Sequence, residues 1–172
     1  LLLAVNYNSF AVSKEDKERE SSYLLQIKNE NDSDAMFDLG LLYDEQEKYD
    51  LAEKYYLMAV KYNNGSAMTN LGLIYENQKK YEHEEKYYLM AVEEESDTGM
   101  YNLGLLYDHP KKYTLAEKSY LMAIQNNYSD AMYNLALLYD NQEKFSLAEK
   151  YYLMAIKEND SDAMYNLALI YD

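Results

Sequence analysis

The sequence predicts an all-α fold, a right-handed superhelical solenoid of antiparallel helix pairs with a 32-residue repeat. The first observation behind this prediction is a fixed period, because the same residue types recur every 32 positions along the 172-residue chain. One such series keeps a small residue in every copy: Gly40, Gly72, Gly104, Ala136 and Ala168. The second observation is that each half of the repeat has the apolar spacing of an amphipathic helix. Units of this kind bury their apolar faces only against their neighbours.

The first half of each repeat is expected to be a helix that packs on two sides. Successive residues lie 100° apart around a helix, so one face of residues 130–140 carries Met132, Leu135, Ala136 and Tyr139. The apolar arc is too wide for a single partner helix, and contacts with both the partner helix and the adjacent repeat are expected. A small residue in the Gly40 series would let two helices approach closely.

The second half of each repeat is expected to be another helix. In residues 146–156 the predicted buried stripe is Ala148, Tyr152, Ala155 and Ile156. The pattern of a capping box, a Ser, Thr or Asp followed three residues later by Glu, predicts where these helices begin. It occurs as Asp50 with Glu53, Thr114 with Glu117, and Ser146 with Glu149.

These patterns divide the chain into two regions. Residues 33–172 are expected to form one continuous solenoid, with helix pairs at about 33–62, 65–94, 97–126 and 129–158 and a lone first helix at about 161–172. Residues 1–32 are expected to form a partial or irregular repeat. In it, residues 23–28 would be a second helix, residues 3–7 a matching first helix, and the Lys- and Glu-rich segment between them a loop. The chain begins at Leu1 and stops within a repeat, which favours a piece of a longer protein.

Composition narrows the classes of partner. The net charge of −15 argues against nucleic acid and anionic membranes, because phosphate neutralisation needs clusters of Lys and Arg. It favours a basic protein or peptide, or simply good solubility. The chain has no Cys, which fits a reducing, cytoplasmic location. The apolar residues 1–5 are too few for a membrane span.

No enzymatic chemistry is indicated, and neither a cofactor nor a metal is expected. His83 and His109 are expected in different turns, with Asp108 and His109 at a helix end, and neither histidine belongs to a recognisable nucleophile constellation. Phosphate-loop, zinc and calcium-loop spacings do not occur.

The repeat resembles a known family. Met36, Leu39, Gly40 and Tyr43, followed by Ala52, Tyr56 and Ala59, are similar to the tetratricopeptide repeat and equally to the related Sel-like repeat. The resemblance covers about 33–172. This sequence departs from the family in its shorter period, in the missing Pro near the repeat end, and in two substitutions. The mid-repeat Gly is replaced by Glu47, Lys79, Lys111 and Glu143, and the small residue that opens the second helix is Glu84 in the second repeat.

The remaining face of the first helix is polar and is the candidate binding site. It carries no Lys or Arg. It repeats an aromatic residue, which is replaced by Thr69 in the second repeat, then Asn or Asp, and then an acidic residue six positions after that Asn or Asp. The candidate peptide-binding residues are Phe37, Asp38, Asp44, Asn70, Glu76, Tyr101, Asn102, Asp108, Tyr133, Asn134, Asp140, Tyr165 and Asn166. The family resemblance implies that this face lines a concave groove and that its Asn residues grip the ligand backbone. An Asn amide offers a donor and an acceptor to an extended peptide, and the acidic residues favour basic side chains. Simple solvation of an exposed face is the alternative explanation.

A second feature is a row of Leu on the second helices, at Leu57, Leu89, Leu121 and Leu153. The row is either a docking surface or is covered by the neighbouring repeat. The final helix also has an apolar face, with Met164, Leu169 and Ile170, that has no following helix to cover it. Self-association through this open end is therefore expected.

The function predicted from these features is a scaffold that binds an extended, basic peptide or protein segment in an acidic groove lined by Asn and Tyr. The alternatives are a structural module that assembles with itself, and a non-catalytic arm of a larger protein.

Overall fold

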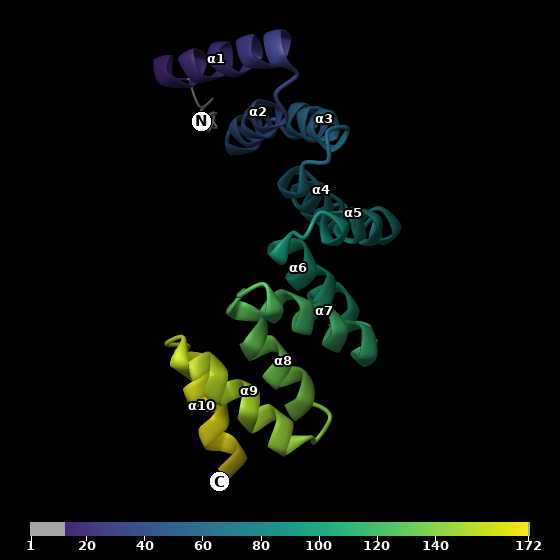
Figure 1. Cartoon of the computed structure of the whole chain (residues 1–172), viewed down its shortest axis with the longest axis vertical. Helices are drawn as coiled ribbons and strands as arrows, with labels where there is room; N and C mark the ends of the chain where they lie inside the picture. The colour runs from purple at the N-terminus through teal and green to yellow at the C-terminus, as the bar shows by residue number, and fades with distance from the viewer. Residues whose placement is uncertain (1–12, 172) are drawn as a thin grey trace, which may run out of the picture. The chain divides into compact units, whose positions relative to one another are not determined.

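The computed structural model of the protein describes residues 13–171, and every regular element in that stretch is a helix (Figure 1). The helices are α1 (Lys14–Glu30), α2 (Ser33–Glu45), α3 (Tyr49–Val60), α4 (Gly65–Asn77), α5 (Tyr81–Glu93), α6 (Asp97–Asp108), α7 (Tyr113–Gln125), α8 (Asp130–Asp140), α9 (Phe145–Lys157) and α10 (Ser161–Tyr171). The prediction of an all-α solenoid of helix pairs is confirmed.

The chain divides into two compact units, Leu1–Ala67 and Met68–Asp172. In the first unit, α2 packs against both α1 and α3. In the second unit, each helix from α6 to α9 packs against the helix before it and the helix after it. The first helices of two adjacent repeats, α6 and α8, also touch each other. This agrees with the expectation that the wide apolar arc of a first helix meets two neighbours.

A residue in the left-handed conformation follows each helix from α1 to α9. These residues lie sixteen positions apart, have φ between 51° and 67°, and none of them is Gly: Asn31, Glu47, Asn63, Lys79, Glu95, Lys111, Asn127, Glu143 and Asn159. The turns inside repeats and the turns between repeats therefore share one conformation. The four mid-repeat positions are those where related repeats carry Gly, so the backbone keeps the conformation that Gly would favour.

Two hydrogen bonds close each of these turns after α2 to α9. After α8, the Glu143 N–H donates to the carbonyl of Asp140 (2.8 Å) and the Lys144 N–H donates to the carbonyl of Tyr139 (2.9 Å). This pair of bonds defines the Schellman motif, which satisfies carbonyls that the helix end would otherwise leave unpaired. The Lys144 ammonium also lies 5.6 Å from the centre of the Tyr139 ring, so the turn and the helix are joined by a side-chain contact as well.

The predicted capping boxes of the second helices are wrong. Asp50, Thr114 and Ser146 each lie at the second position inside a helix. The residues before those helices are lysines that make no side-chain capping hydrogen bond within the described chain: Lys48, Lys112 and Lys144. The physical reason is that the last residue of each Schellman turn is itself the residue that precedes the next helix, so the turn sets where the helix begins. In the turns inside repeats that residue is a Lys, whose side chain has no hydrogen-bond acceptor. Side-chain caps open α2, α4, α6 and α10 instead, where an oxygen of Asp32, Asn64, Ser96 or Asp160 accepts a backbone N–H, whereas α8 has no such cap among the described residues.

The small residue of the first helix faces a buried Tyr of the second. A Cβ built on Gly104 would lie 2.5 Å from two carbons of the Tyr120 ring, and a Cβ on Gly40 would lie 2.5 Å from the Tyr56 ring. Such distances are too short for an unstrained contact, so glycine permits the ring to rest directly on the first helix. The predicted close approach of the two helices is therefore confirmed.

In both units, tyrosine hydroxyls join first helices to the helix before them. Tyr107 Oη donates to Glu85 Oε1 (2.8 Å), and Tyr171 makes the equivalent bond to Glu149. In the first unit Tyr43 Oη donates to Glu20 of α1 (2.8 Å). The same Tyr also stacks on a ring of its own second helix, as Tyr43 does on Tyr55 with centroids 5.5 Å apart. One side chain thus contributes to contacts both within and between repeats.

The helix α1 is longer than the sequence indicated. The Lys- and Glu-rich segment that was expected to be a loop is its first half. A complete capping box formed by Ser13 and Asp16 starts the helix, and Lys14 pairs with Glu18 one turn later at 3.5 Å. Charged residues of this kind have good helix propensity, which the loop prediction neglected. The predicted helix at residues 3–7 lies outside the described residues.

The left-handed turns generate a test of the fold. An L-residue pays about 1 kcal/mol to adopt this conformation, whereas Gly adopts it freely. Glu143→Gly should therefore raise the free energy of unfolding by about 1 kcal/mol relative to Glu143→Ala, as measured by urea denaturation. The Ala variant is the matched control, because it removes the same side chain but keeps the Cβ. Equal stability of the two variants would contradict the strain at this position.

Candidate functional site

The predicted Asn residues are half-buried, and two of them are tied to the repeat before them. Asn134 Nδ2 donates to Tyr101 Oη (3.0 Å), and Asn166 Nδ2 donates to Tyr133 Oη (2.9 Å). The structure thus brings together the aromatic position of one repeat and the Asn position of the next. Tyr165, the last aromatic residue of the series, is exposed.

These bonds decide which polar atoms can meet a ligand. Asn134 Nδ2 also donates to the backbone carbonyl of Asp130 (3.2 Å), so both hydrogens of its amide group have acceptors inside the protein. The carbonyl oxygen of the side chain remains as an acceptor. This differs from the expectation that each Asn would offer a donor as well as an acceptor.

The second repeat interrupts the series. Thr69 stands where Tyr101 and Tyr133 stand in later repeats; it is buried, and its hydroxyl lies 3.1 Å from Ser96 Oγ. Asn102 therefore has no Tyr hydroxyl of the preceding repeat to bond with. Its side chain instead lines a pocket, described below. Asn70, at the equivalent position of the second repeat, is half-buried.

In the first unit the candidate residues lie on α2. The ring of Phe37 is half-buried, with its centroid 5.8 Å from that of Tyr56. Asp38 and Asp44 are half-buried too, and burial raises the pKa of both carboxyls above the usual value. Nearby Asp34 raises the pKa of Asp38 further. Arg19 opposes part of this rise at Asp38, but the net effect of partial burial is that both carboxylates are costly to keep charged.

In α4, α6 and α8 the acidic residue near the end of the helix lies near a buried Tyr of the following helix. Glu76 Oε2 accepts a hydrogen bond from Tyr88 Oη at 3.3 Å. In the next repeats the acid is Asp108 or Asp140, one methylene shorter, and the hydroxyls of Tyr120 and Tyr152 are buried without a hydrogen-bond partner among the described residues. Burial raises the pKa of Tyr120 and Tyr152, and the nearby Asp adds to the effect.

A pocket of about 1030 Å³ lies at the turn between α6 and α7 in the second unit. Three predicted site residues meet there: Glu76, Asn102 and Asp108. The start of α5, the end of α6 and the following turn supply most of the remaining wall. That wall includes Tyr81, Glu82, Glu84, Glu85, Leu105, Leu106, Tyr107, His109, Pro110, Lys111, Lys112, Tyr113 and Asn141.

The pocket has an excess of negative charge. Five carboxylates line it, at Glu76, Glu82, Glu84, Glu85 and Asp108, against the two ammonium groups of Lys111 and Lys112. None of the five forms a salt bridge within residues 13–171. Tyrosine hydroxyls orient two of them, because Tyr88 donates to Glu76 and Tyr107 donates to Glu85. A cavity with unpaired carboxylates attracts cations.

Glu84 is the unusual member of this group. Its side chain is only 3% exposed, and Oε2 is buried without a hydrogen-bond partner in the described structure. Burial, with smaller contributions from Glu76 and Glu85, raises the pKa of this carboxyl to about 7. In the other repeats this position of the second helix holds Ala52, Ala116 or Ala148, all buried. The sequence showed this substitution as a departure from the repeat, but it was not recognised as part of the site.

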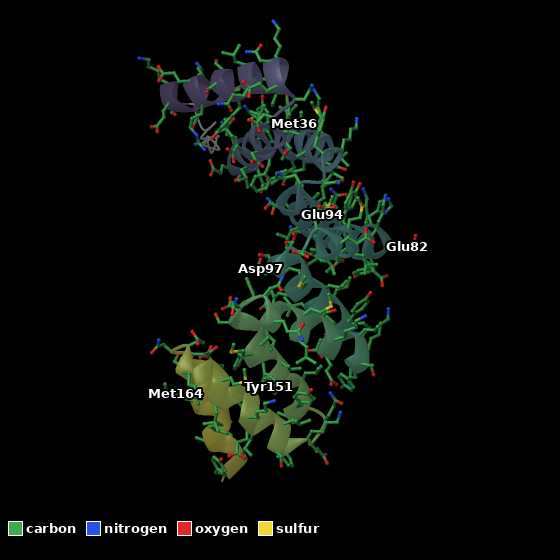
Figure 2. The ribbon with its side chains drawn as sticks, viewed as in Figure 1. Met36, Glu82, Glu94, Asp97, Tyr151 and Met164 are labelled. Atoms are coloured by element: carbon green, nitrogen blue, oxygen red, sulfur yellow. The ribbon has the colours of Figure 1, made fainter. Side chains whose placement is uncertain are left out.

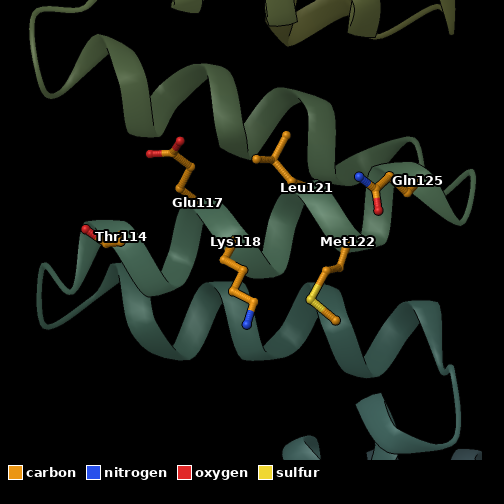
Figure 3. Close-up of a pocket in the computed structure, with 6 residues that line it drawn as sticks. All are labelled: Thr114, Glu117, Lys118, Leu121, Met122 and Gln125. Atoms are coloured by element: carbon orange, nitrogen blue, oxygen red, sulfur yellow. The ribbon is translucent and has the colours of Figure 1, made fainter.

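The Leu row on the second helices is only partly covered. Leu89 and Leu153 are 43% and 45% exposed, whereas Leu57 and Leu121 are half-buried. A shallow hollow of about 360 Å³ lies beside Leu121 on α7, where Glu117 and Leu121 point to one side of the helix and Lys118 and Met122 to the other (Figure 3). Because exposed and half-buried residues alternate along the Leu row, the row is not a continuous apolar surface and is not fully covered by neighbouring repeats.

The apolar side chains of α10 are more exposed than their equivalents in earlier repeats. Met164, labelled in Figure 2, is 51% exposed, whereas Met100 is 5% exposed. Tyr171 is exposed, whereas Tyr139 is buried. Ala163 and Leu167 are buried, so one side of α10 is packed and the other is open.

Two further features bear on the class of site. His83, expected in a turn, lies inside the first turn of α5, with its ring 5.1 Å from that of Tyr75, while His109 follows α6 as predicted. The error arose because α5 begins at Tyr81 with no side-chain cap to mark its start.

Over the described residues, no group of three or more His, Cys, Asp or Glu could hold a metal ion. No helix in the same stretch is long and apolar enough to cross a membrane.

Comparisons with known proteins agree with this architecture. Residues 37–99 and 131–164 each match a family described as tetratricopeptide repeat, and together the matches cover more than half of the chain. No curated protein matches the sequence.

Several solved structures share the fold. A Sel1 repeat protein from Oxalobacter formigenes is 24% identical, with a TM-score of 0.76, and the match covers 91% of this chain and 70% of that one. The protein c5321, a protective antigen of uropathogenic Escherichia coli strains with an SLR fold, is 20% identical, with a TM-score of 0.78 and coverage of 88% and 36%. PilF of Pseudomonas aeruginosa is 20% identical, with a TM-score of 0.63 and coverage of 84% and 78%.

The raised pKa of Glu84 predicts a dependence of stability on pH. The folded pKa is about 7 and the ordinary value is 4.5, so between these pH values the folded chain holds a proton that the unfolded chain has released. The free energy of unfolding should therefore fall by about 3 kcal/mol as pH rises through this window. Glu84→Ala, which restores the residue of the other repeats, should abolish this fall and be the more stable protein at pH 8.

Urea denaturation at pH 4.5 and pH 8 measures the effect. Glu93→Ala is the matched control, because it removes the same charge from an exposed position of the same helix. It should keep the wild-type dependence on pH. If wild type and Glu84→Ala change equally between the two pH values, the buried carboxyl is not the group that titrates.

Proposed function

This chain belongs to the tetratricopeptide and Sel-like repeat family, whose fold is a protein-interaction scaffold, and we propose that it binds an extended, basic peptide or protein segment along the acidic face of its first helices. Repeats of this family are generally non-catalytic. In the second unit the binding face comprises the Asn, Tyr and acidic residues that recur on α4, α6, α8 and α10, and α2 of the first unit carries equivalent residues.

The observation that carries this proposal is the meeting of Glu76, Asn102 and Asp108 in one pocket. They come from the candidate series of two successive repeats, and the carboxylates lack salt bridges within the described chain. An acidic surface of this kind favours basic side chains and repels acidic ones. The net charge of −15 adds a long-range attraction for a basic partner.

The polar groups on this face suit a peptide backbone. The side-chain oxygen of Asn134 is an acceptor for a peptide N–H, because its amide hydrogens are already bonded to Tyr101 and Asp130. Tyr101 is held in place by that bond and offers a ring for apolar contact. Fixed groups of this kind lose little freedom on binding, which favours affinity.

The proposal is tested by titrating two labelled peptides of equal length, one of alternating Lys and Gly and one of alternating Glu and Gly, with fluorescence anisotropy as the readout. The Lys peptide should bind and the Glu peptide should not. Raising the salt concentration should weaken binding, because the long-range part of the attraction is screened. Equal affinity for the two peptides would contradict the proposal.

Variants locate the surface. Asp108→Asn with Asp140→Asn should weaken binding of the Lys peptide about tenfold, because two carboxylates of the acidic face are lost. Glu94→Gln with Glu158→Gln removes the same charge from exposed positions at the ends of second helices and is the control. If the control weakens binding as much, net charge and not this face governs the interaction.

A second candidate function is assembly with another copy of the chain through the open side of α10. The exposure of Met164 favours it, because the equivalent Met36, Met68 and Met100 are buried and Met132 is half-buried. Light scattering over a range of protein concentrations should show association that Met164→Lys abolishes, because a charge at the contact opposes burial. Leu105→Lys, at an exposed apolar position outside α10, should leave the association unchanged. A wild-type protein that is monomeric at all concentrations would exclude this mode.

A further inference from the structure

We propose that the pocket at Glu84 takes the guanidinium group of an arginine side chain from the bound segment, with the Glu84 carboxylate as its buried partner. The assignment rests on the proposed peptide-binding function and specifies where the segment is anchored. It identifies arginine as the side chain that the scaffold selects.

The argument starts from an incomplete interaction in the protein alone. Glu84 lines the pocket, is 3% exposed, and has a buried carboxylate oxygen that no described group bonds to. Burying a carboxylate without a partner is costly, and the cost disappears when a cation with suitable hydrogens is placed beside it. The equivalent Ala52, Ala116 and Ala148 show that the helix packing itself has no need of a carboxyl at this position.

The groups around Glu84 favour a cation from outside over one of the protein's own. The Lys112 ammonium already contacts an aromatic ring, because it lies 5.4 Å from the centre of the Tyr107 ring. Lys111 is exposed, and neither lysine forms a salt bridge with a carboxylate of the pocket in the described structure. The carboxylates of Glu76 and Glu85 flank the site, and both raise the pKa of Glu84. An arriving positive charge would therefore be stabilised by three carboxylates together.

The shape and walls of the pocket favour a guanidinium. The volume of about 1030 Å³ is large enough for a long side chain, and Tyr81, Tyr107 and Tyr113 contribute aromatic rings to its wall. A guanidinium is flat, stacks on such rings, and presents hydrogens in a fork that matches a carboxylate. A metal ion fits less well, because the carboxylates of the described chain do not converge in a group of three that could hold one.

The position of the pocket indicates a side chain of a peptide. Glu76, Asn102 and Asp108 belong both to the pocket wall and to the proposed peptide-binding face. A segment lying along that face would pass the mouth of the pocket, and a long side chain could enter while the backbone stays outside. Glu84 would then distinguish segments that carry an arginine at this place from segments that are only basic on average.

The test uses a probe that contains the side chain without a peptide. N-acetylargininamide carries a single positive charge, and N-acetylcitrullinamide is its neutral counterpart of nearly the same shape. Each is titrated into wild type, Glu84→Ala and Glu93→Ala at pH 8, and amide shifts are followed by NMR. The arginine probe should saturate shifts of the pocket residues in wild type and Glu93→Ala. It should bind at least about tenfold more weakly to Glu84→Ala.

The outcomes separate this inference from the wider proposal. If the arginine and citrulline probes bind alike, or if Glu84→Ala binds the arginine probe as well as wild type does, the assignment of the pocket is overturned. If the basic peptide still binds to Glu84→Ala with wild-type affinity, the acidic face stands and the pocket assignment fails. If the arginine probe binds through Glu84 but no basic peptide binds more tightly than the probe, the pocket assignment stands and the extended binding face fails. Glu84→Gln, which keeps the shape and removes the charge, should lose the arginine probe as Glu84→Ala does.

Discussion

The turn that ends each helix from α1 to α9 is the constraint on which the other repeated contacts depend. A residue with positive φ recurs every sixteen positions, and after α2 to α9 two backbone hydrogen bonds close the turn in the same way. Helices of nearly equal length therefore present the same faces to their neighbours. The Tyr–Gly contacts and the Tyr–Glu bonds can repeat only because this spacing is kept. Non-glycine residues pay a conformational cost at these positions, which the hydrogen bonds offset. In the turns inside repeats, the packing of the following Lys on a Tyr ring contributes as well.

Tyrosine links the core of this protein to its acidic surface. The ring fills space beside a small residue or another ring, and the hydroxyl needs an acceptor when it is buried. Glu85 and Glu76 meet that need for Tyr107 and Tyr88. Part of the negative charge is therefore structural, and it also leaves carboxylates oriented toward the pocket. Glu84 differs, because its buried Oε2 has no such bond in the described structure and its burial makes the charged form costly. A group that costs stability and lines a cavity is a reasonable place to look for function.

The candidate site could be predicted in part. The absence of Lys and Arg from one helical face indicated Glu76, Asn102 and Asp108, and these residues meet in the pocket. The bond between Asn134 and Tyr101 spans 33 residues and depends on how two adjacent repeats are placed, so no pattern within one helix could indicate it. The same holds for Glu84. Its departure from Ala was visible, but its burial depends on the packing of α5 with the neighbouring helices.

From residue 33 onward, the sequence by itself determined the helices, their pairing and the small residue at each close contact, because these follow from local periodicity copied in every repeat. The first half of α1 lies outside that periodicity and did not follow from it. It did not determine how the second helices begin, since the backbone of the preceding turn, and not Asp50, Thr114 or Ser146, sets their first residue. Only the tertiary structure decided which polar atoms remain free. The sequence pattern around an Asn or Glu on a helix face is the same whether or not a Tyr hydroxyl of a neighbouring repeat forms a hydrogen bond with its side chain. That outcome depends on distances between helices, which local periodicity does not specify.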